Sequence, residues 1–411
     1  MNNYFAYLKL YAYEKNIQTK DLAIYTNRNV GYISRILNHK IYNPDNETLL
    51  AIEQRLGLNH AKITKKQPDF EHLFFYYMNV VYTAKQKEKD TLYAKIIHNH
   101  EVLNTPYEIY VLLAQLVQKT LKNNFDEEFY STDKKLTYIY NGLEDEAKSI
   151  YIVYHFGALV LNHTYQEARK FMSELDKIKT NKAQLKMMKS YYLFIYHSQA
   201  GKTERCLHYY EECKKWCAIT DNITIPFNLE IAYGTYLMKK YQYKKGIEHN
   251  LSLLETSHRL NGYNERVILN NIARGYTLLH DYEKALHYYL KAIKNVAADI
   301  FQCFDIAWCY YKTNNNKKAR QFIVKGRKLS IQNEQTLLLE WLEAMINKPY
   351  SNKCGELLER VLNIDGLSEN SKNFVLIQLE DFYYHTKEYE KAREIANTLI
   401  KQYYFLLTEK Q

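Results

Sequence analysis

Cysteine and histidine are the residues of this sequence whose spacing gives the most direct test for chemistry. Three of the six cysteines, Cys206, Cys213 and Cys217, share one face of a predicted helix. No nearby pattern completes a zinc site around them, and the chain contains no Cys-x-x-Cys pair. The sequence therefore predicts buried, reduced thiols in a cytosolic protein. The cluster His98-Asn99-His100 lacks carboxylate or cysteine partners at ligand spacing, so we expect it at the surface.

Motifs that carry enzymatic chemistry are missing from the sequence. It has no glycine-rich phosphate loop, no HExxH metalloprotease motif and no nucleophile elbow. We therefore expect a protein that is not an enzyme and that needs no cofactor and no metal ion.

The composition predicts an all-α protein. Glycine and proline are scarce, at 12 and 5 of 411 residues, which favours long helices over strands or disorder. The 41 tyrosines suit helix interfaces at which a ring is buried and a hydroxyl stays in contact with water. No apolar run is long enough to span a bilayer, and residues 1–10 lack the core of a signal peptide, so the expected location is cytoplasmic.

A period of 34 residues organises the second half of the chain. Small and aromatic residues recur at that interval: Ala273, Tyr276, Ala285 and Ala292 are followed by Ala307, Tyr310, Ala319 and Gly326. This pattern resembles the tetratricopeptide repeat, a pair of helices that stacks into a right-handed α-solenoid. Its alanines would let neighbouring helices approach closely. We expect the solenoid to occupy residues 70–411, and the resemblance implies a domain that serves peptide sensing and dimerisation.

The first 66 residues are unusually basic. They hold ten Lys/Arg and five Asp/Glu, half of the excess charge of the chain, which indicates a module that meets a polyanion. Helical patterns cover residues 4–15, 18–25, 30–37 and 45–56. Asn27 stands in a tight turn that needs a positive φ, Asn29 is placed to cap the third helix, and Gly57 ends the fourth.

This layout resembles the Xre-type helix-turn-helix domain over residues 8–58. The resemblance depends on Leu22-Ala23, on Tyr32 to Ile36 and on Asn43-Pro44. It implies a DNA-binding domain at residues 1–60, joined to the repeats by a linker at 61–69, with the third helix in the major groove. Transferred by position, the base-edge contacts are Asn29, Val30, Tyr32 and Arg35, and the phosphate contacts are Lys20, Arg28, Asn38 and Lys40.

The resemblance to tetratricopeptide proteins implies a concave groove lined by the first helix of each repeat, where a peptide would bind. Asparagine can pair with a peptide backbone, and arginine with a carboxylate. The candidate peptide-binding residues are Asn228, Thr235, Asn270, Asn271, Arg274, Thr277, Asp305, Trp308 and Tyr311. Two alternatives stay open: Arg274 and Asp305 pair across adjacent repeats, and Trp308 packs between repeats.

A helix-turn-helix followed by such repeats resembles the peptide-pheromone receptors of Gram-positive bacteria and their mobile elements, the PlcR, NprR, PrgX, Rgg and arbitrium-receptor group. The resemblance implies a cytoplasmic, homodimeric quorum-sensing transcription regulator that binds operator DNA and a short signalling peptide. The alternative is a tetratricopeptide scaffold for a protein partner, such as a response regulator or an antirepressor.

Overall fold

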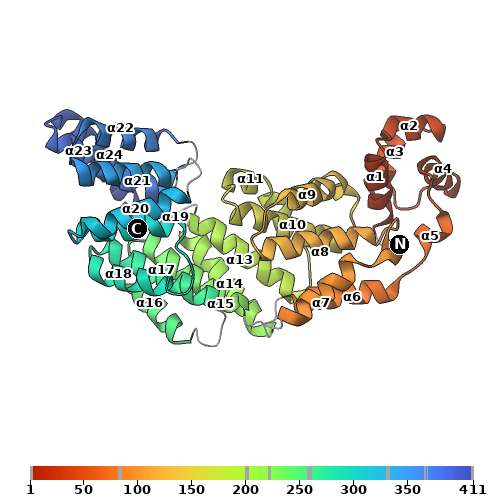
Figure 1. Cartoon of the computed structure of the whole chain (residues 1–411). Helices are drawn as coiled ribbons and strands as arrows, with labels where there is room; N and C mark the ends of the chain where they lie inside the picture. Colours follow the sequence, from red (N-terminus) through yellow and green to blue (C-terminus); the bar gives the residue numbers. More distant parts are fainter. Residues whose placement is uncertain are drawn as a thin grey trace. The chain divides into compact units, whose positions relative to one another are not determined.

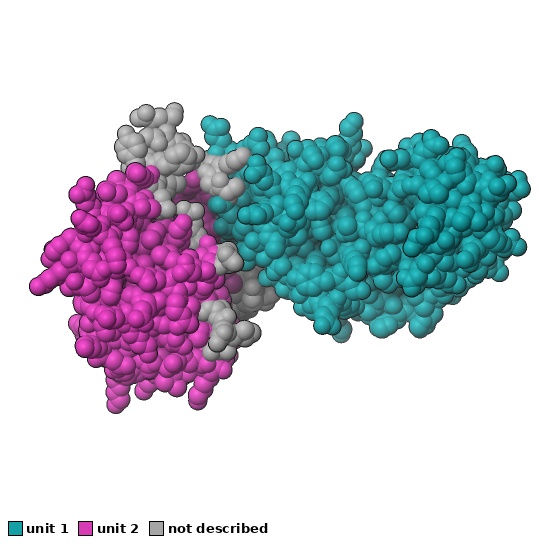
Figure 2. All heavy atoms as spheres, turned by 90° about the horizontal axis from the view of Figure 1, so that it is seen from above, with its two compact units in different colours: residues 1–232 teal, residues 233–411 magenta. Residues whose placement is uncertain are grey.

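The regular elements that the structure describes are all helical, which confirms the predicted fold class. The structure is a computed structural model that describes residues 3–81, 86–199, 203–220, 224–256, 262–329, 334–364, 367 and 369–408. Within these ranges it contains helices and no strand (Figure 1). The chain divides into two compact units, residues 1–232 and 233–411 (Figure 2), and each is described by itself.

Four short helices open unit 1 at the predicted positions: α1 (Tyr4–Glu14), α2 (Thr19–Tyr25), α3 (Val30–Leu37) and α4 (Asn46–Leu56). The predicted turn chemistry is confirmed. Asn27 has φ 51°, and the Asn29 side chain accepts a hydrogen bond from the Tyr32 amide at 2.7 Å. Gly57 ends α4 with φ 73°. The side chains of Ile33, Ile36 and Ile52 are fully buried and form the core of these helices, whereas Leu49 is half-buried.

Residues 61–69, predicted as a linker, are largely helical. They hold the end of α5 (His60–Thr64) and the start of α6 (Pro68–Val80). Ile63 is buried. The Gln67 amide donates a hydrogen bond to the Tyr107 hydroxyl at 3.0 Å. This segment therefore contacts the helices that follow it.

Helix α1 packs on two of the elements that follow α6 in unit 1, α9 and η2. The elements after α6 are α7 (Gln86–Ile97), η1 (His100–Val102), α8 (Glu108–Leu121), α9 (Glu127–Ile139) and η2 (Tyr140–Gly142). Lys135 of α9 pairs with Glu14 of α1 at 2.6 Å. The rings of Tyr13 and Tyr138 lie 4.5 Å apart between centroids. At Gly142, a Cβ atom would lie 2.6 Å from the carbonyl oxygen of Leu37, so no side chain fits there without movement. The first four helices are thus docked on α9 and η2.

The remaining helices of unit 1 continue as successive pairs (Figure 1). They are α10 (Asp145–Leu161), α11 (Tyr165–Lys170), α12 (Met172–Lys177), α13 (Ala183–Gln199) and α14 (Thr203–Ile219), followed by α15 (Thr224–Lys239), which contributes residues to both units.

Unit 2 repeats the same helical pair. Its helices are α16 (Tyr243–Thr256), α17 (Gly262–Leu278), α18 (Tyr282–Ala292), α19 (Ile300–Lys312), α20 (Asn316–Lys328), α21 (Glu334–Asn347), α22 (Asn352–Leu362), α23 (Glu369–His385) and α24 (Tyr389–Thr408). Ala273, Ala285, Ala307 and Ala319 are fully buried, which confirms that the small positions lie at helix contacts. Because their side chains are small, the first and second helices of a pair can approach closely.

The turns inside the pairs share one backbone feature. A residue other than glycine has φ between 58° and 65° at His163, Tyr241, His280, Asn314 and Lys387. Each stands two residues before a second helix begins. Such a conformation costs about 1 kcal/mol for a residue with a Cβ atom. The sequence shows that these turns are polar and alike, but it does not show that each contains a residue with positive φ.

Candidate functional site

The outer face of α3 and the adjoining turns carry most of the predicted DNA contacts. Lys20, Asn29, Arg35 and Lys40 are exposed, and Val30 is 50% exposed. The opposite face of α3 is buried in the domain. Of these exposed residues, Val30 and Arg35 belong to α3, whereas Asn29 caps it, Lys40 follows it and Lys20 lies on α2. Lys20 also lines a cavity of about 470 Å³ beside Tyr13 and Tyr138.

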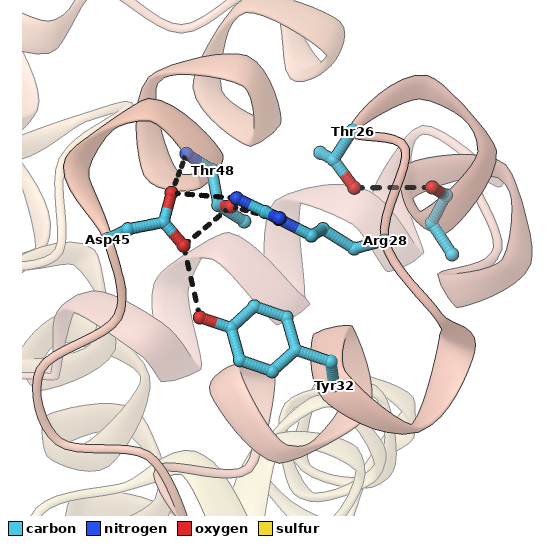
Figure 3. A network of polar contacts seen from close by, with 6 residues as sticks. Thr26, Arg28, Tyr32, Asp45 and Thr48 are labelled. Carbon is cyan, nitrogen blue, oxygen red and sulfur yellow. Dashed lines mark hydrogen bonds and ion pairs between the residues drawn. The ribbon is translucent and has the colours of Figure 1, made fainter.

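Arg28 and Tyr32 belong instead to a polar network around Asp45, at the start of α4 (Figure 3). Arg28 donates from Nε to Thr48 Oγ1 at 3.0 Å and from Nη2 to Asp45 at 3.4 Å. The Tyr32 hydroxyl donates to Asp45 Oδ2 at 3.1 Å. The network ties the beginning of α3 to the beginning of α4.

The Asp45 carboxylate is held in its charged form. Hydrogen bonds from the Thr48 amide and hydroxyl lower the pKa of Asp45 to about 2, with smaller contributions from Tyr32 and Arg28. Asp45 also caps α4, because its side chain accepts from the Thr48 amide at 2.8 Å. The sequence indicated the start of this helix, but nothing in the spacing indicated that Arg28 and Tyr32 share its capping carboxylate.

Asn38 is likewise engaged inside the domain. Its amide donates to the Ser34 carbonyl at 2.9 Å, and its oxygen accepts from Lys9 Nζ at 2.7 Å. It therefore links α3 to α1, the helix that docks on α9.

In unit 2, the predicted asparagines link neighbouring first helices. Asn271 of α17 donates to Thr235 of α15 at 3.3 Å. Asn270 accepts from Gln302 of α19 at 2.9 Å. We call this row of polar contacts across α15, α17 and α19 the first-helix ladder; its members are Thr235, Asn270, Asn271 and Gln302. The ladder brings together three of the predicted residues and adds Gln302, which sequence reasoning missed.

Asp305 and Arg274 lie beside this ladder. The Tyr289 hydroxyl donates to Asp305 Oδ2 at 3.1 Å. Burial raises the pKa of Asp305 to about 6, while the charge of Arg274 and the Tyr289 hydrogen bond lower it. Arg274 is exposed. The charge of Arg274 acts on Asp305 across adjacent repeats, but these two described side chains form no ion pair, so the pairing of the first alternative is not observed.

Trp308 packs between repeats, which favours the second alternative. It is 7% exposed, and its ring centroid lies 5.6 Å from that of Trp341 and 5.4 Å from that of Phe374. Tyr311 is half-buried against it. The Thr277 hydroxyl donates to the carbonyl oxygen of its own helix at Ala273, at 3.1 Å.

Asn228, the remaining predicted peptide contact, lies half-buried on α15 in unit 1. The described hydrogen bonds of the ladder do not include it.

No described residues form a metal centre of three or more histidine, cysteine, aspartate or glutamate side chains. His98 and His100 are exposed, as predicted. Among the described helices, none is both long and apolar enough to cross a membrane.

Comparisons with known proteins identify the fold. No protein-family model and no curated protein sequence matches the chain. The structure does match that of a Rap protein complexed with competence and sporulation factor, with a TM-score of 0.67 and 14% identity, covering 83% of this chain and 99% of that one. The chain has the fold of that protein.

Two structures of NprR agree with this match. NprR in complex with its cognate peptide NprX gives a TM-score of 0.63 at 15% identity, over 82% of this chain and 99% of that one. The apo form of the quorum sensor NprR from B. thuringiensis gives 0.62 at 14% identity, over 81% and 98%. These matches confirm the predicted tetratricopeptide-like solenoid.

Proposed function

We propose that this protein is a quorum-sensing transcription regulator, which acts in the cytoplasm as a homodimer. Its repeats bind a short signalling peptide, and its first four helices bind operator DNA. The observation that carries the peptide part is the first-helix ladder with Arg274 and Asp305 beside it. The solved structures of the same fold support it, since one holds competence and sporulation factor and another its cognate peptide NprX.

The ladder offers the donors and acceptors that an extended peptide needs. The bond between Asn271 and Thr235 is long, at 3.3 Å, so a peptide amide can replace it at small cost. Arg274 has an exposed guanidinium that suits a peptide carboxylate. Asp305 is placed to receive a peptide cation, since pairing would offset the cost of its burial.

Peptide binding would act through the spacing of the repeats. Because ladder bonds connect consecutive first helices, a peptide that takes over one partner removes a tie between two repeats. A ligand shifts such an equilibrium only as far as it binds one arrangement better than the other. Replacement of the bond between Asn271 and Thr235 supplies that difference.

The DNA part of the proposal depends on the exposed face of α3. Arg35 would reach base edges, while Lys20 and Lys40 would hold phosphates. We assign Arg28 and Tyr32 the role of positioning the start of α3 through Asp45. Docking of the domain on α9 and η2 fixes α3 relative to the first repeats of unit 1.

Peptide binding is tested with the full-length protein. Mass spectrometry of small peptides that co-purify from the native host identifies the ligand, and calorimetry with a synthetic copy measures its affinity. Asn271→Ala with Arg274→Ala should weaken binding by roughly 10–100-fold, as expected for the loss of about 1.5–3 kcal/mol in hydrogen bonds to charged groups. Arg360→Ala, at an exposed arginine of α22, is the matched control and should bind normally. Equal affinity of the double variant and the wild type would refute this site.

DNA binding is tested separately by fluorescence anisotropy with DNA from upstream of the gene, at several salt concentrations. Arg35→Ala should weaken binding, and Arg393→Ala, which removes an exposed charge from α24, should not. Wild-type protein that fails to bind at low salt would refute the DNA part and leave the peptide part standing. A stoichiometric protein partner in place of a co-purified peptide would favour the scaffold alternative.

A further inference from the structure

Two cysteine thiols lie next to each other inside the α13–α14 pair of unit 1. Cys213 and Cys217 are one helical turn apart on α14, and their Sγ atoms are 4.0 Å apart. Cys213 is fully buried and Cys217 is 8% exposed. The two thiols therefore lie side by side in the helix interface, and Cys217 is the one nearer to solvent.

A methionine of the partner helix runs along the same face. Cys213 Sγ donates to the Met187 carbonyl at 3.6 Å. The Thr220 hydroxyl donates to Met187 Sδ at 3.3 Å and to the Cys217 carbonyl at 3.3 Å. Thr220 directly follows the end of α14 and stands three residues after Cys217, so the Met187 side chain extends from its carbonyl beside Cys213 toward the end of the helix that carries Cys217.

The distance between the two sulfurs fits a shared metal ion. A metal–thiolate bond of about 2.3 Å and a separation of 4.0 Å give an angle of about 120° at the metal. That angle is trigonal and leaves one position for a third ligand. Thiolate and thioether donors favour Cu(I), whereas structural zinc requires four ligands, and the described residues offer no cluster of three histidine, cysteine or carboxylate groups.

We propose that Cys213 and Cys217 bind one Cu(I) ion, with the Met187 thioether as third ligand. Each thiol loses its proton to solvent, and the copper keeps its oxidation state, so no electron is transferred. The inference is independent of the proposed function, because α13 and α14 lie outside the first-helix ladder.

Cys206 is the matched control on the same helix. It is also fully buried, but it stands about two turns before Cys213, and its Sγ donates to the Phe194 carbonyl at 3.8 Å. A general affinity of buried thiols for copper would involve Cys206 as well.

The test is an anaerobic titration of the full-length reduced protein with Cu(I) against bathocuproine disulfonate. We expect one ion per chain, held about 100-fold or more tightly than by the Cys213→Ser/Cys217→Ser variant. Met187→Leu should lose roughly tenfold in affinity, and Cys206→Ser should match the wild type. Equal affinity of wild type and double variant, or an equal loss in Cys206→Ser, would overturn the proposal.

X-ray absorption of the copper-loaded wild type identifies the atoms that bind copper, and it tests the proposal even where a serine variant fails to fold. A shell of three sulfur atoms at about 2.3 Å is expected. A shell dominated by nitrogen or oxygen would show that the copper is bound elsewhere and would overturn the assignment.

Discussion

Replacement of Asp305 by asparagine should stabilise unit 2 at neutral pH. Burial raises the pKa of Asp305 to about 6, above the value of 3.8 for an exposed aspartate. The folded state therefore binds its proton more tightly than the unfolded state does. As the pH rises from about 4 to about 6, the unfolded chain has already released this proton, and the free energy of unfolding falls.

The size of the effect follows from the same shift. A difference of about 2 pKa units, at 1.36 kcal/mol each, lowers the free energy of unfolding by up to about 3 kcal/mol. This loss is complete above pH 6 and absent below pH 4. The introduced asparagine side chain would keep an oxygen to accept the Tyr289 hydroxyl but would carry no charge. Asp305→Asn should thus be more stable than the wild type by up to about 3 kcal/mol at pH 7.5, and equally stable at pH 3.5.

Urea unfolding followed by tryptophan fluorescence measures this difference. Trp308 and Trp341 report on unit 2, so a Trp216→Phe background removes the signal from unit 1. Asp381→Asn is the control, because it removes an aspartate from the first helix α23. The same stability difference at pH 3.5 and pH 7.5, or a less stable Asp305→Asn at pH 7.5, would refute the electrostatic reasoning.

Three further predictions follow from the described contacts. Gly142→Leu should release α1 from η2, because the new Cβ would meet the Leu37 carbonyl. We expect faster limited proteolysis near residues 57–68. Gly31→Leu, at an exposed glycine, is the control. Lys387→Gly should raise the free energy of unfolding by about 1 kcal/mol, because glycine adopts φ 65° without strain; no gain would contradict this. Because the pKa of Asp45 is about 2, the wild type should melt at a higher temperature than Asp45→Asn at pH 6, and this advantage should shrink as the pH falls toward 2; an advantage independent of pH would contradict it.

The sequence predicted those features that depend on spacing along one helix. The helix at Val30–Leu37, its cap at Asn29 and the buried alanines at Ala273 and Ala307 are such features. Each follows from local backbone chemistry or from a 34-residue period that repeats the same packing. The role of α3 was implied instead by the resemblance to the Xre-type domain, and Arg35 is the basic residue that this helix exposes.

What the sequence could not predict is which neighbouring helix covers a side chain. Trp308 stands on the same face as Asp305, yet Trp341 and Phe374 bury it from α21 and α23. Arg28 looks like a free phosphate contact until α4 brings Asp45 to it. Partners of this kind are 17 or more residues apart and have no periodic signal in a single sequence.

The close fit at Gly142 has a practical consequence for dissecting this protein. A fragment cut at residue 60 would leave α1 without α9 and η2, and Tyr7, Leu10 and Leu37, now buried, lie on or beside the helices that make this contact. Such a fragment would expose apolar side chains that are buried in the whole chain and would be prone to self-association, although it would keep the hydrogen bond between Lys9 and Asn38. Attempts to produce the first four helices separately should therefore carry the chain through Leu143, so that α9 and η2 stay in contact with α1.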